Sequence, residues 1–353
     1  MAKPLKILYF GSYDPEYPYN SILISGLRQN GVDVIECQDD SPGLKKFIKL
    51  FFKHWSLRND YDAMVVGFLG QVIMPLAKLI TRKPVIFSAP VSLYDANVRD
   101  RKVIKPISLK AAYYWFLDWF SMRLADLVFC GTNQDIEYAA GEFHIRKEKF
   151  RRMLIGAEDN IFYPVAAPGK KDYFLVSFHG TFIPVQGVEF IVEAAKILES
   201  ENIKFLIIGS GQEKQNTLDL ARRLSVKNVE FLGLLPKKQL ASRISQADLC
   251  LGIFGNTPRT QRAIPFKIYE CLAMRKPVIT ADTPAARELF DEKELMLVKA
   301  ADPQSLADGI LRLKNNPEIL ANLAQNGYNK FIKLASPKVL GGTLKDIIIK
   351  LIQ

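Results

Sequence analysis

The chain has 353 residues, 48% of them hydrophobic and 24% charged, so it is long enough for two domains that each bury a core. These fractions are ordinary for a folded protein and exclude a disordered chain. The formal net charge is +11, and the basic excess is spread over both halves of the sequence. Such an excess suits an anionic membrane surface, a nucleic acid or a phosphorylated substrate, and charge alone does not choose among them.

The sequence predicts no membrane-spanning segment, no signal peptide and no paired cysteines. The longest apolar stretches, residues 63–77 and 111–120, contain polar or Gly interruptions and are shorter than the ~20 residues of a spanning helix. The opening MAKPLKILYFGSYD lacks the pattern of a signal peptide, so we expect a cytoplasmic protein. The four cysteines stand singly and predict buried free thiols: Cys37, Cys130, Cys250 and Cys271.

Apolar strands alternate with helical stretches along most of the chain. We expect strands at 6–10, 32–37, 61–68, 83–90 and 125–132, with a helix over 20–30. The pattern then restarts, with strands at 172–180, 203–211, 229–233, 247–254, 277–282 and 295–300, and helices over 188–200, 212–224, 239–245 and 266–274. This alternation predicts two doubly wound α/β domains.

The Pro- and Ala-rich segment 160–171 is typical of an interdomain linker. We therefore expect an N-terminal domain over 1–170 and a C-terminal domain over 171–335. The tail from Pro317 is helical in period, and the helix over 336–353 is free to pack on either domain, including back on the first.

Ligands of open α/β sheets bind beyond the carboxyl ends of the strands. Two strands end in Gly-containing turns at this edge: Gly11-Ser12-Tyr13-Asp14 in the first domain and His179-Gly180-Thr181 in the second. A tight turn needs the same glycines, so ligand contact and simple turn geometry both explain them.

Several cofactor classes are disfavoured. The segment after Gly209 has the first two glycines of a dinucleotide-binding GxGxxG but not the third, and no GxxxxGK[ST] motif occurs. The three histidines lie far apart, and the one DxD, Asp60-Tyr-Asp62, precedes a strand. We expect neither a metal ion nor a nicotinamide cofactor.

The stretch 259–280 carries the strongest chemical signal. A loop with Arg259 and Arg262 leads into a helix with Lys267 in its first turn and Glu270 three residues later. A cation at the positive end of a helix suits a bound phosphate. An ion pair between Lys267 and Glu270 explains the same spacing without any ligand.

PFKIYECLAMRKPVIT resembles the donor-site segment PNKxxEALAxGKPVI of the retaining glycosyltransferases of family four, which have the GT-B fold of two Rossmann-like domains facing across a cleft. GSYDPEYPYNSILISGLRQNGVDVIEC resembles the family's acceptor-domain opening, FRRMLIGAEDNIFYP its crossover and HGTFIPVQGVEFIVEAA its GRLxxxKGxxxLIEAA loop. The four matches are in the family's order and span nearly the whole chain.

The resemblance implies a nucleoside-diphosphate sugar as donor. Glu270 would hold the ribose hydroxyls as the second Glu of an E-x7-E motif, while Lys267 and the loop Pro284-Ala285-Ala286 before Glu288 would face the diphosphate. The family explains retention by front-side attack within an ion pair, so no covalent nucleophile is implied. The residues implied for donor binding are Gly180, Thr181, Gly209, Arg259, Lys267, Glu270, Pro284, Ala285, Ala286 and Glu288.

The chain departs from the family where cations are usual. Thr181 and Gln186 replace the Arg and Lys of the GRLxxxKG loop, and Arg262 replaces the first Glu of the E-x7-E motif. A departing diphosphate needs its charge neutralised, so our hypothesis is that Arg259, Arg262 or Lys267 supplies the missing cation.

On the acceptor side, Asp95 and Asp100 follow the strand at 83–90 and are candidates to orient or deprotonate an acceptor hydroxyl. Leu44, Phe47, Ile48, Phe51 and Trp55 form an apolar helical stripe within 41–59, a run with several lysines and no acids, where Leu50 and Phe52 look exposed. Residues 99–110 are also basic and lead into the aromatic run AYYWFLDWF. These features predict a peripheral protein on the inner face of an anionic membrane, with a lipid-linked or other glycan acceptor.

Three alternatives stay open. The lost donor-site cations permit a noncatalytic partner or scaffold with the same fold, and a nucleotide-sugar epimerase or phosphorylase would share the fold as well. Nucleic-acid binding is the weakest, because the charge is spread through folded domains and no recognised binding motif occurs. The leading hypothesis is a glycosyltransferase.

Overall fold

The computed structural model describes residues 4–165, 169 and 171–353 of the chain. It divides into two compact units, the first made of Met1–Glu158 and Leu334–Gln353 and the second of Asp159–Lys333. Each unit is built on a parallel six-stranded sheet with helices, so the predicted pair of α/β domains is confirmed. The N-terminal segment of the first unit extends to Glu158, whereas the predicted boundary was at 170. Part of the predicted linker, residues 166–168 and 170, lies outside the described residues.

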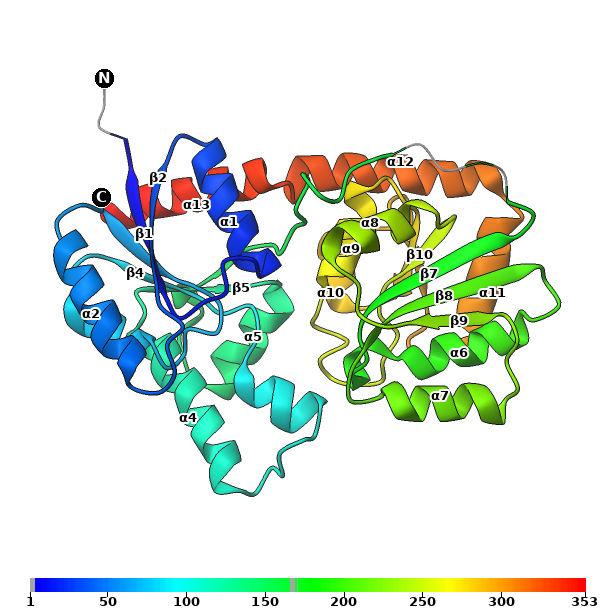
Figure 1. Ribbon diagram of the computed structural model, residues 1–353, viewed down its shortest axis with the longest axis horizontal. Coiled ribbons are helices and arrows are strands. Elements are labelled where there is room, and N and C mark those ends of the chain that lie inside the picture. Colours follow the sequence, from blue (N-terminus) through cyan, green and yellow to red (C-terminus); the bar gives the residue numbers. More distant parts are fainter. Residues whose placement is uncertain (1–3, 166–168, 170) are drawn as a thin grey trace. The chain divides into compact units, whose positions relative to one another are not determined.

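The sheet of the first unit has the strand order β2-β1-β3-β4-β5-β6 (Figure 1). Its strands are β1 (Lys6–Gly11), β2 (Asp33–Gln38), β3 (Ala63–Val66), β4 (Val85–Ser88), β5 (Leu127–Cys130) and β6 (Phe150–Arg152). Its helices are α1 (Pro18–Gln29), α2 (Lys45–Leu57), α3 (Met74–Ile80), α4 (Leu109–Leu124), α5 (Asn133–Glu142) and α13 (Pro337–Ile352), with a π-helical turn η1 (Asp95–Asp100) and a 3-10 turn η2 (Lys147–Lys149). β1, β3, β4 and β5 are almost entirely buried, as their continuous apolar runs predict.

The C-terminal helix α13 packs against α1, and the two lie side by side in Figure 1. Their backbones touch at Gly26 and Gly341, since a Cβ atom added at Gly341 would lie 1.9 Å from the carbonyl carbon of Gly26. Asn30 strengthens the contact by donating from Nδ2 to the Lys338 carbonyl at 2.7 Å. The chain end thus completes the first unit, although it is encoded after the second.

The sheet of the second unit has the order β12-β11-β10-β7-β8-β9. Its strands are β7 (Phe174–Thr181), β8 (Ile203–Ser210), β9 (Val229–Leu232), β10 (Leu249–Leu251), β11 (Val278–Ala281) and β12 (Met296–Val298). Its helices are α6 (Val188–Ile197), α7 (Lys214–Arg223), α8 (Lys237–Ser245), α9 (Phe266–Ala273), α10 (Pro284–Arg287), α11 (Pro303–Lys314) and α12 (Pro317–Leu334), with a 3-10 turn η3 (Pro184–Gln186). β7 and β10 are central, so the residues that follow them lie at the middle of the sheet's carboxyl edge.

Several local predictions need correction. β6 was not predicted, because a three-residue strand carries too little alternation to be recognised from the sequence. Residues 284–286 begin the short helix α10 rather than a loop, since Thr283 caps the turn by accepting from the Ala286 N–H at 3.1 Å. Leu50 of α2 is fully buried against the first sheet, not exposed. The four cysteines are buried free thiols, as predicted.

Candidate functional site

A pocket of about 270 Å³ lies at the carboxyl edge of the second sheet. The end of β7 and the 3-10 turn η3 form one side, and the first turns of α9 form another. Apolar side chains from the segment after β9 complete the wall. The lining residues are His179, Gly180, Thr181, Gln186, Ile208, Gly209, Leu234, Leu235, Leu240, Pro265, Phe266, Lys267 and Glu270. Five of the residues predicted for donor binding therefore come together here: Gly180, Thr181, Gly209, Lys267 and Glu270.

Lys267 is held inside this pocket without a carboxylate partner among the described residues. Its amine donates a hydrogen bond to Gln186 Oε1 and lies over the Phe178 ring, 3.6 Å from the ring centroid. The residue is only 4% exposed, and burial lowers the pKa of the amine well below its ordinary value of 10.5. An anion that binds beside this buried amine would stabilise its charged form.

The glycines of the pocket have close-packing roles. A Cβ at Gly180 would lie 2.8 Å from the Lys267 amine, so glycine leaves room for that amine beside β7. A Cβ at Gly209 would lie 1.9 Å from the Gly180 carbonyl oxygen, and both residues have positive φ angles. The two strand ends therefore require glycine whether or not a ligand binds.

Glu270 is held by His179, a pairing that the sequence did not predict. His179 Nε2 lies 2.7 Å from Glu270 Oε2, and both side chains are buried. The two residues are 91 positions apart, so no local spacing signals the pair. The structure records no ion pair between Lys267 and Glu270 among the residues it describes, which rules against the simple i,i+3 pair in this conformation.

The other predicted donor residues do not line this pocket. Arg259 and Arg262 lie in the segment before α9, and Pro284, Ala285 and Ala286 lie on α10 with Glu288 just after it. The Ala285 N–H donates to the Gln261 carbonyl at 3.2 Å, which ties α10 to the arginine segment. Of the three cations put forward for the diphosphate, Lys267 alone lines the pocket.

The first unit places Gly11, Ser12, Tyr13 and Asp14 at the carboxyl end of β1, as predicted. Tyr13 is buried and donates its hydroxyl to Glu36 Oε2 at 3.1 Å, and burial with the nearby Glu36 raises the pKa of this hydroxyl. The Asp14 carboxylate accepts the Glu16 N–H at 2.9 Å, so it stabilises the turn that leads into α1. Tyr13 and Asp14 thus have structural roles at this edge.

Asp95 and Asp100 lie on η1 and are each 2% exposed, with contacts inside the chain. Acceptor activation by either carboxylate stays a prediction. Asp118 of α4 was not predicted to contribute here. It is fully buried and accepts hydrogen bonds from Ser92 Oγ at 2.7 Å, the Tyr94 N–H at 2.9 Å and Gln71 Nε2 at 3.2 Å. Asp118 therefore anchors the segment that leads into η1.

Most of the apolar stripe of α2 faces solvent. The exposed fractions are 78% for Leu44, 59% for Ile48, 39% for Phe51, 66% for Phe52 and 56% for Trp55, whereas Phe47 is half-buried against the core. A second exposed apolar group surrounds the start of α4, with Val103 at 59%, Ile107 at 98% and Leu109 at 93% exposed. Lysines stand close to both groups in the sequence: Lys45, Lys46, Lys49, Lys102, Lys105 and Lys110. Both are on the first unit.

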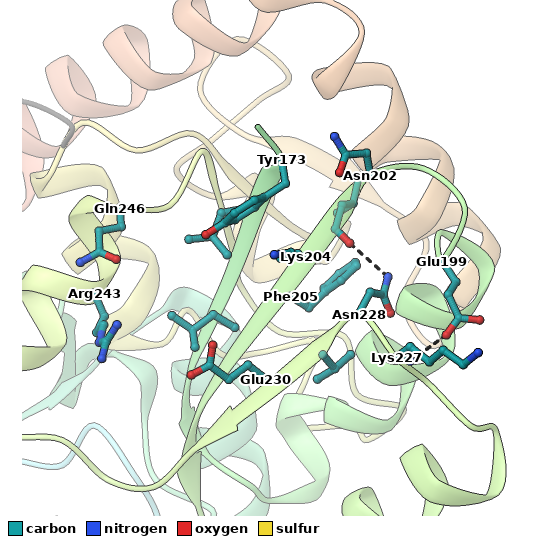
Figure 2. Close-up of a pocket in the computed structure, with 14 residues that line it drawn as sticks. Tyr173, Glu199, Asn202, Lys204, Phe205, Lys227, Asn228, Glu230, Arg243 and Gln246 are labelled. Carbon is teal, nitrogen blue, oxygen red and sulfur yellow. Dashed lines mark hydrogen bonds between the residues drawn. The ribbon is translucent and has the colours of Figure 1, made fainter. Parts of the chain in front are cut away.

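A larger pocket of about 560 Å³ lies at the opposite edge of the second sheet, where β8 and β9 begin (Figure 2). Tyr173 lies beneath Lys204 there, with 4.0 Å between the Lys204 amine and the ring centroid. None of the residues predicted for donor or acceptor binding lines this pocket. Because ligands of such sheets bind at the carboxyl ends of the strands, the smaller pocket is the better candidate for the substrate.

Two further properties concern only the part of the chain that the structure describes. No group of three or more His, Cys, Asp or Glu side chains in it is arranged to hold a metal ion. No helix in it combines the length and apolar character needed to cross a membrane.

Comparison with known proteins identifies the family of the second unit. Residues 161–330 match the family model of glycosyl transferases group 1. An uncharacterized glycosyltransferase of Methanocaldococcus jannaschii, MJ1178, is 25% identical over 49% of this chain and 48% of its own length. The alpha-D-kanosaminyltransferase of Streptomyces kanamyceticus is 25% identical over 51% of this chain and 47% of its own. The chain thus spans about half the length of the curated relatives it matches.

Solved structures resemble the whole chain. The crystal structure of Anabaena Alr3699/HepE in complex with UDP-glucose superposes with a TM-score of 0.72 at 16% identity, covering 98% of this chain and 100% of that one. At this identity the likeness shows the fold alone, which is the GT-B architecture of two Rossmann-like domains.

Proposed function

Because residues 161–330 of this chain belong to the glycosyl transferases group 1 family, we propose that the protein is a retaining glycosyltransferase. Its donor is a nucleoside-diphosphate sugar, and its acceptor is a glycan or lipid-linked glycan precursor at a membrane surface. The observation that carries the proposal is the pocket in which Lys267 and Glu270 project from one face of α9.

The pocket provides complementary chemistry for the two ends of a nucleoside diphosphate. The buried amine of Lys267 offers a cation to the diphosphate, and the carboxylate of Glu270 offers an acceptor to the ribose hydroxyls. Arg259 and Arg262 do not line the pocket, so the proposal assigns the missing cation to Lys267. The similar Anabaena protein binds UDP-glucose, which makes UDP the first nucleotide to test.

In the proposed reaction, the bond between the sugar's anomeric carbon and the diphosphate oxygen breaks. The acceptor hydroxyl oxygen bonds to the same face of that carbon, and its proton passes to the leaving diphosphate. Charge grows on the diphosphate as the bond breaks, so a cation held beside it lowers the barrier. The anomeric configuration of the product, measured by proton NMR, tests retention directly.

The exposed surfaces of the first unit support a membrane acceptor. The α2 stripe combines large apolar side chains with neighbouring lysines, and the sequence from Ser41 to Asn59 contains no acid. Apolar side chains enter the lipid interface while the lysines meet anionic headgroups. We therefore place the protein at an anionic membrane surface, with the α2 stripe in contact with lipid.

Thermal shift and calorimetry with a panel of nucleoside diphosphates test the donor site, because a ligand that binds only the folded state raises its stability. We expect one nucleotide to bind the wild-type protein and to bind Glu270→Gln and Lys267→Met at least about tenfold more weakly. Arg259→Ala and Arg262→Ala serve as matched cation controls and are expected to retain most of the affinity.

Turnover separates catalysis from binding. With the nucleotide sugar that binds, Lys267→Met is expected to lower kcat by at least about tenfold, because one lost stabilising contact in a transition state costs that much or more. A well-folded wild-type protein that binds no nucleotide would overturn the proposal and favour the noncatalytic partner. Interconversion of the free nucleotide sugar would instead favour an epimerase.

A further inference from the structure

His179 and Glu270 form a buried pair at the edge of the pocket. His179 comes from the end of β7 and is 5% exposed, and Glu270 comes from the second turn of α9 and is 8% exposed. Their atoms Nε2 and Oε2 are 2.7 Å apart, within the range of a strong hydrogen bond. An ionised carboxylate only accepts, so the imidazole Nε2–H is the donor.

The second oxygen of the carboxylate is left for another partner. Within the described part of the chain, the structure records no hydrogen bond to Glu270 Oε1, and Glu270 lines the pocket. Glu270 Oε1 is absent from the buried side-chain atoms that lack a hydrogen-bond partner, so this oxygen is open to the pocket and can accept from a ligand that enters it. The pair therefore fixes one oxygen and leaves the other available on the pocket side.

The same bond keeps Glu270 away from Lys267. The two residues stand three positions apart on α9, a spacing that favours an ion pair. Instead Lys267 bonds to Gln186 and Glu270 bonds to His179. If they paired with each other, both charges would be neutralised inside the pocket and neither would be free for a ligand.

We propose that His179 is a positioning residue for donor recognition, holding the Glu270 carboxylate so that Oε1 receives the ribose 2′-hydroxyl. This inference rests on the proposed function, since it presumes a nucleoside diphosphate in the pocket. It adds a residue whose effect depends on the sugar of the nucleotide: His179 strengthens the binding of a ribonucleotide and has little effect on a nucleotide that lacks the hydroxyl.

The test measures the Kd of UDP and of 2′-deoxy-UDP by calorimetry for four proteins. Wild type is expected to prefer UDP by about tenfold, because the hydroxyl donates to a charged acceptor. Glu270→Gln reports the preference that remains without the carboxylate. His179→Phe removes the imidazole donor at similar volume, and His179→Gln keeps an N–H donor on the side chain.

We expect the preference for UDP in His179→Phe to fall to the level of Glu270→Gln, with the Kd of 2′-deoxy-UDP changing by less than about threefold, because that ligand lacks the hydroxyl at stake. His179→Gln is expected to recover part of the preference. Thermal unfolding of each variant checks folding, and His179→Gln keeps the test valid if His179→Phe folds poorly.

The outcomes distinguish a failure of the positioning role from a failure of the proposed donor site. If wild type binds UDP and prefers it, and both His179 variants keep the full preference, the positioning role is wrong while the donor site stands. If both His179 variants bind the two nucleotides equally weakly, His179 has only a structural role, which also overturns the inference. If folded wild type binds neither nucleotide, a uridine nucleotide as donor is wrong, and the inference falls with it.

Discussion

The exposed apolar side chains on α2, which include Phe52, give a quantitative test of membrane binding. Phe52 exposes 66% of its surface, and full burial of such a side chain is worth up to about 3 kcal/mol. Immersing the exposed part in lipid therefore contributes about 2 kcal/mol, of which an alanine methyl retains a few tenths. We expect Phe52→Ala to weaken partitioning onto vesicles by about 1.5 kcal/mol, or roughly tenfold.

The assay is flotation with vesicles that contain 30% anionic lipid, repeated with neutral vesicles and at rising salt. Ile197→Ala provides the control, because Ile197 is an exposed apolar residue on α6 of the other unit and is 44% exposed. Lys45→Gln removes one charge near the stripe, worth about 1 kcal/mol at an anionic surface, and its effect is expected to vanish on neutral vesicles. Partitioning of Phe52→Ala within twofold of wild type, or equal recovery of wild type from both vesicle types, would refute the reasoning.

Three further predictions concern stability, each measured by urea or thermal unfolding of the full chain. Burial lowers the pKa of Lys267, so the folded state binds this proton more weakly than the unfolded chain and loses stability as the pH falls below 10.5. Lys267→Met is therefore expected to be more stable than wild type at neutral pH, with a gain that disappears above pH 10.5, and equal stability at pH 7 would contradict this. Gly341→Ala is expected to lower the free energy of unfolding by about 3 kcal/mol or more, because its Cβ would lie 1.9 Å from the backbone of Gly26. Gly141→Ala in α5 is the control: its Cβ would meet no atom within 4 Å, and the substitution is expected to raise the free energy of unfolding by up to about 1 kcal/mol. Equal effects of the two glycine substitutions would show that α13 does not hold α1. Asp118→Asn is expected to cost about 2 kcal/mol, because its amide NH₂ would face one of three hydrogen-bond donors, and unchanged unfolding would exclude the anchoring role.

The sequence by itself determined the elements and their class. Eight of the twelve strands lie wholly within predicted ranges. β1, β2 and β7 overrun theirs by one residue, at Gly11, Gln38 and Thr181, and β6 was not predicted. Runs of buried apolar residues and helical spacing depend on neighbours a few positions away, so one sequence is enough to recognise them. The helical tail after Pro317 was predictable for the same reason, whereas the role predicted for Glu270 came from the resemblance of its segment to a family motif.

Only the tertiary structure decided which side chains meet. Glu270 pairs with His179 and Lys267 with Gln186 across 91 and 81 positions, and α13 returns to α1 past the whole second unit. It also decided that Leu50 is buried while its neighbour Phe52 faces solvent. Such contacts depend on how distant segments pack, and local periodicity carries no information about which distant partner a side chain will find.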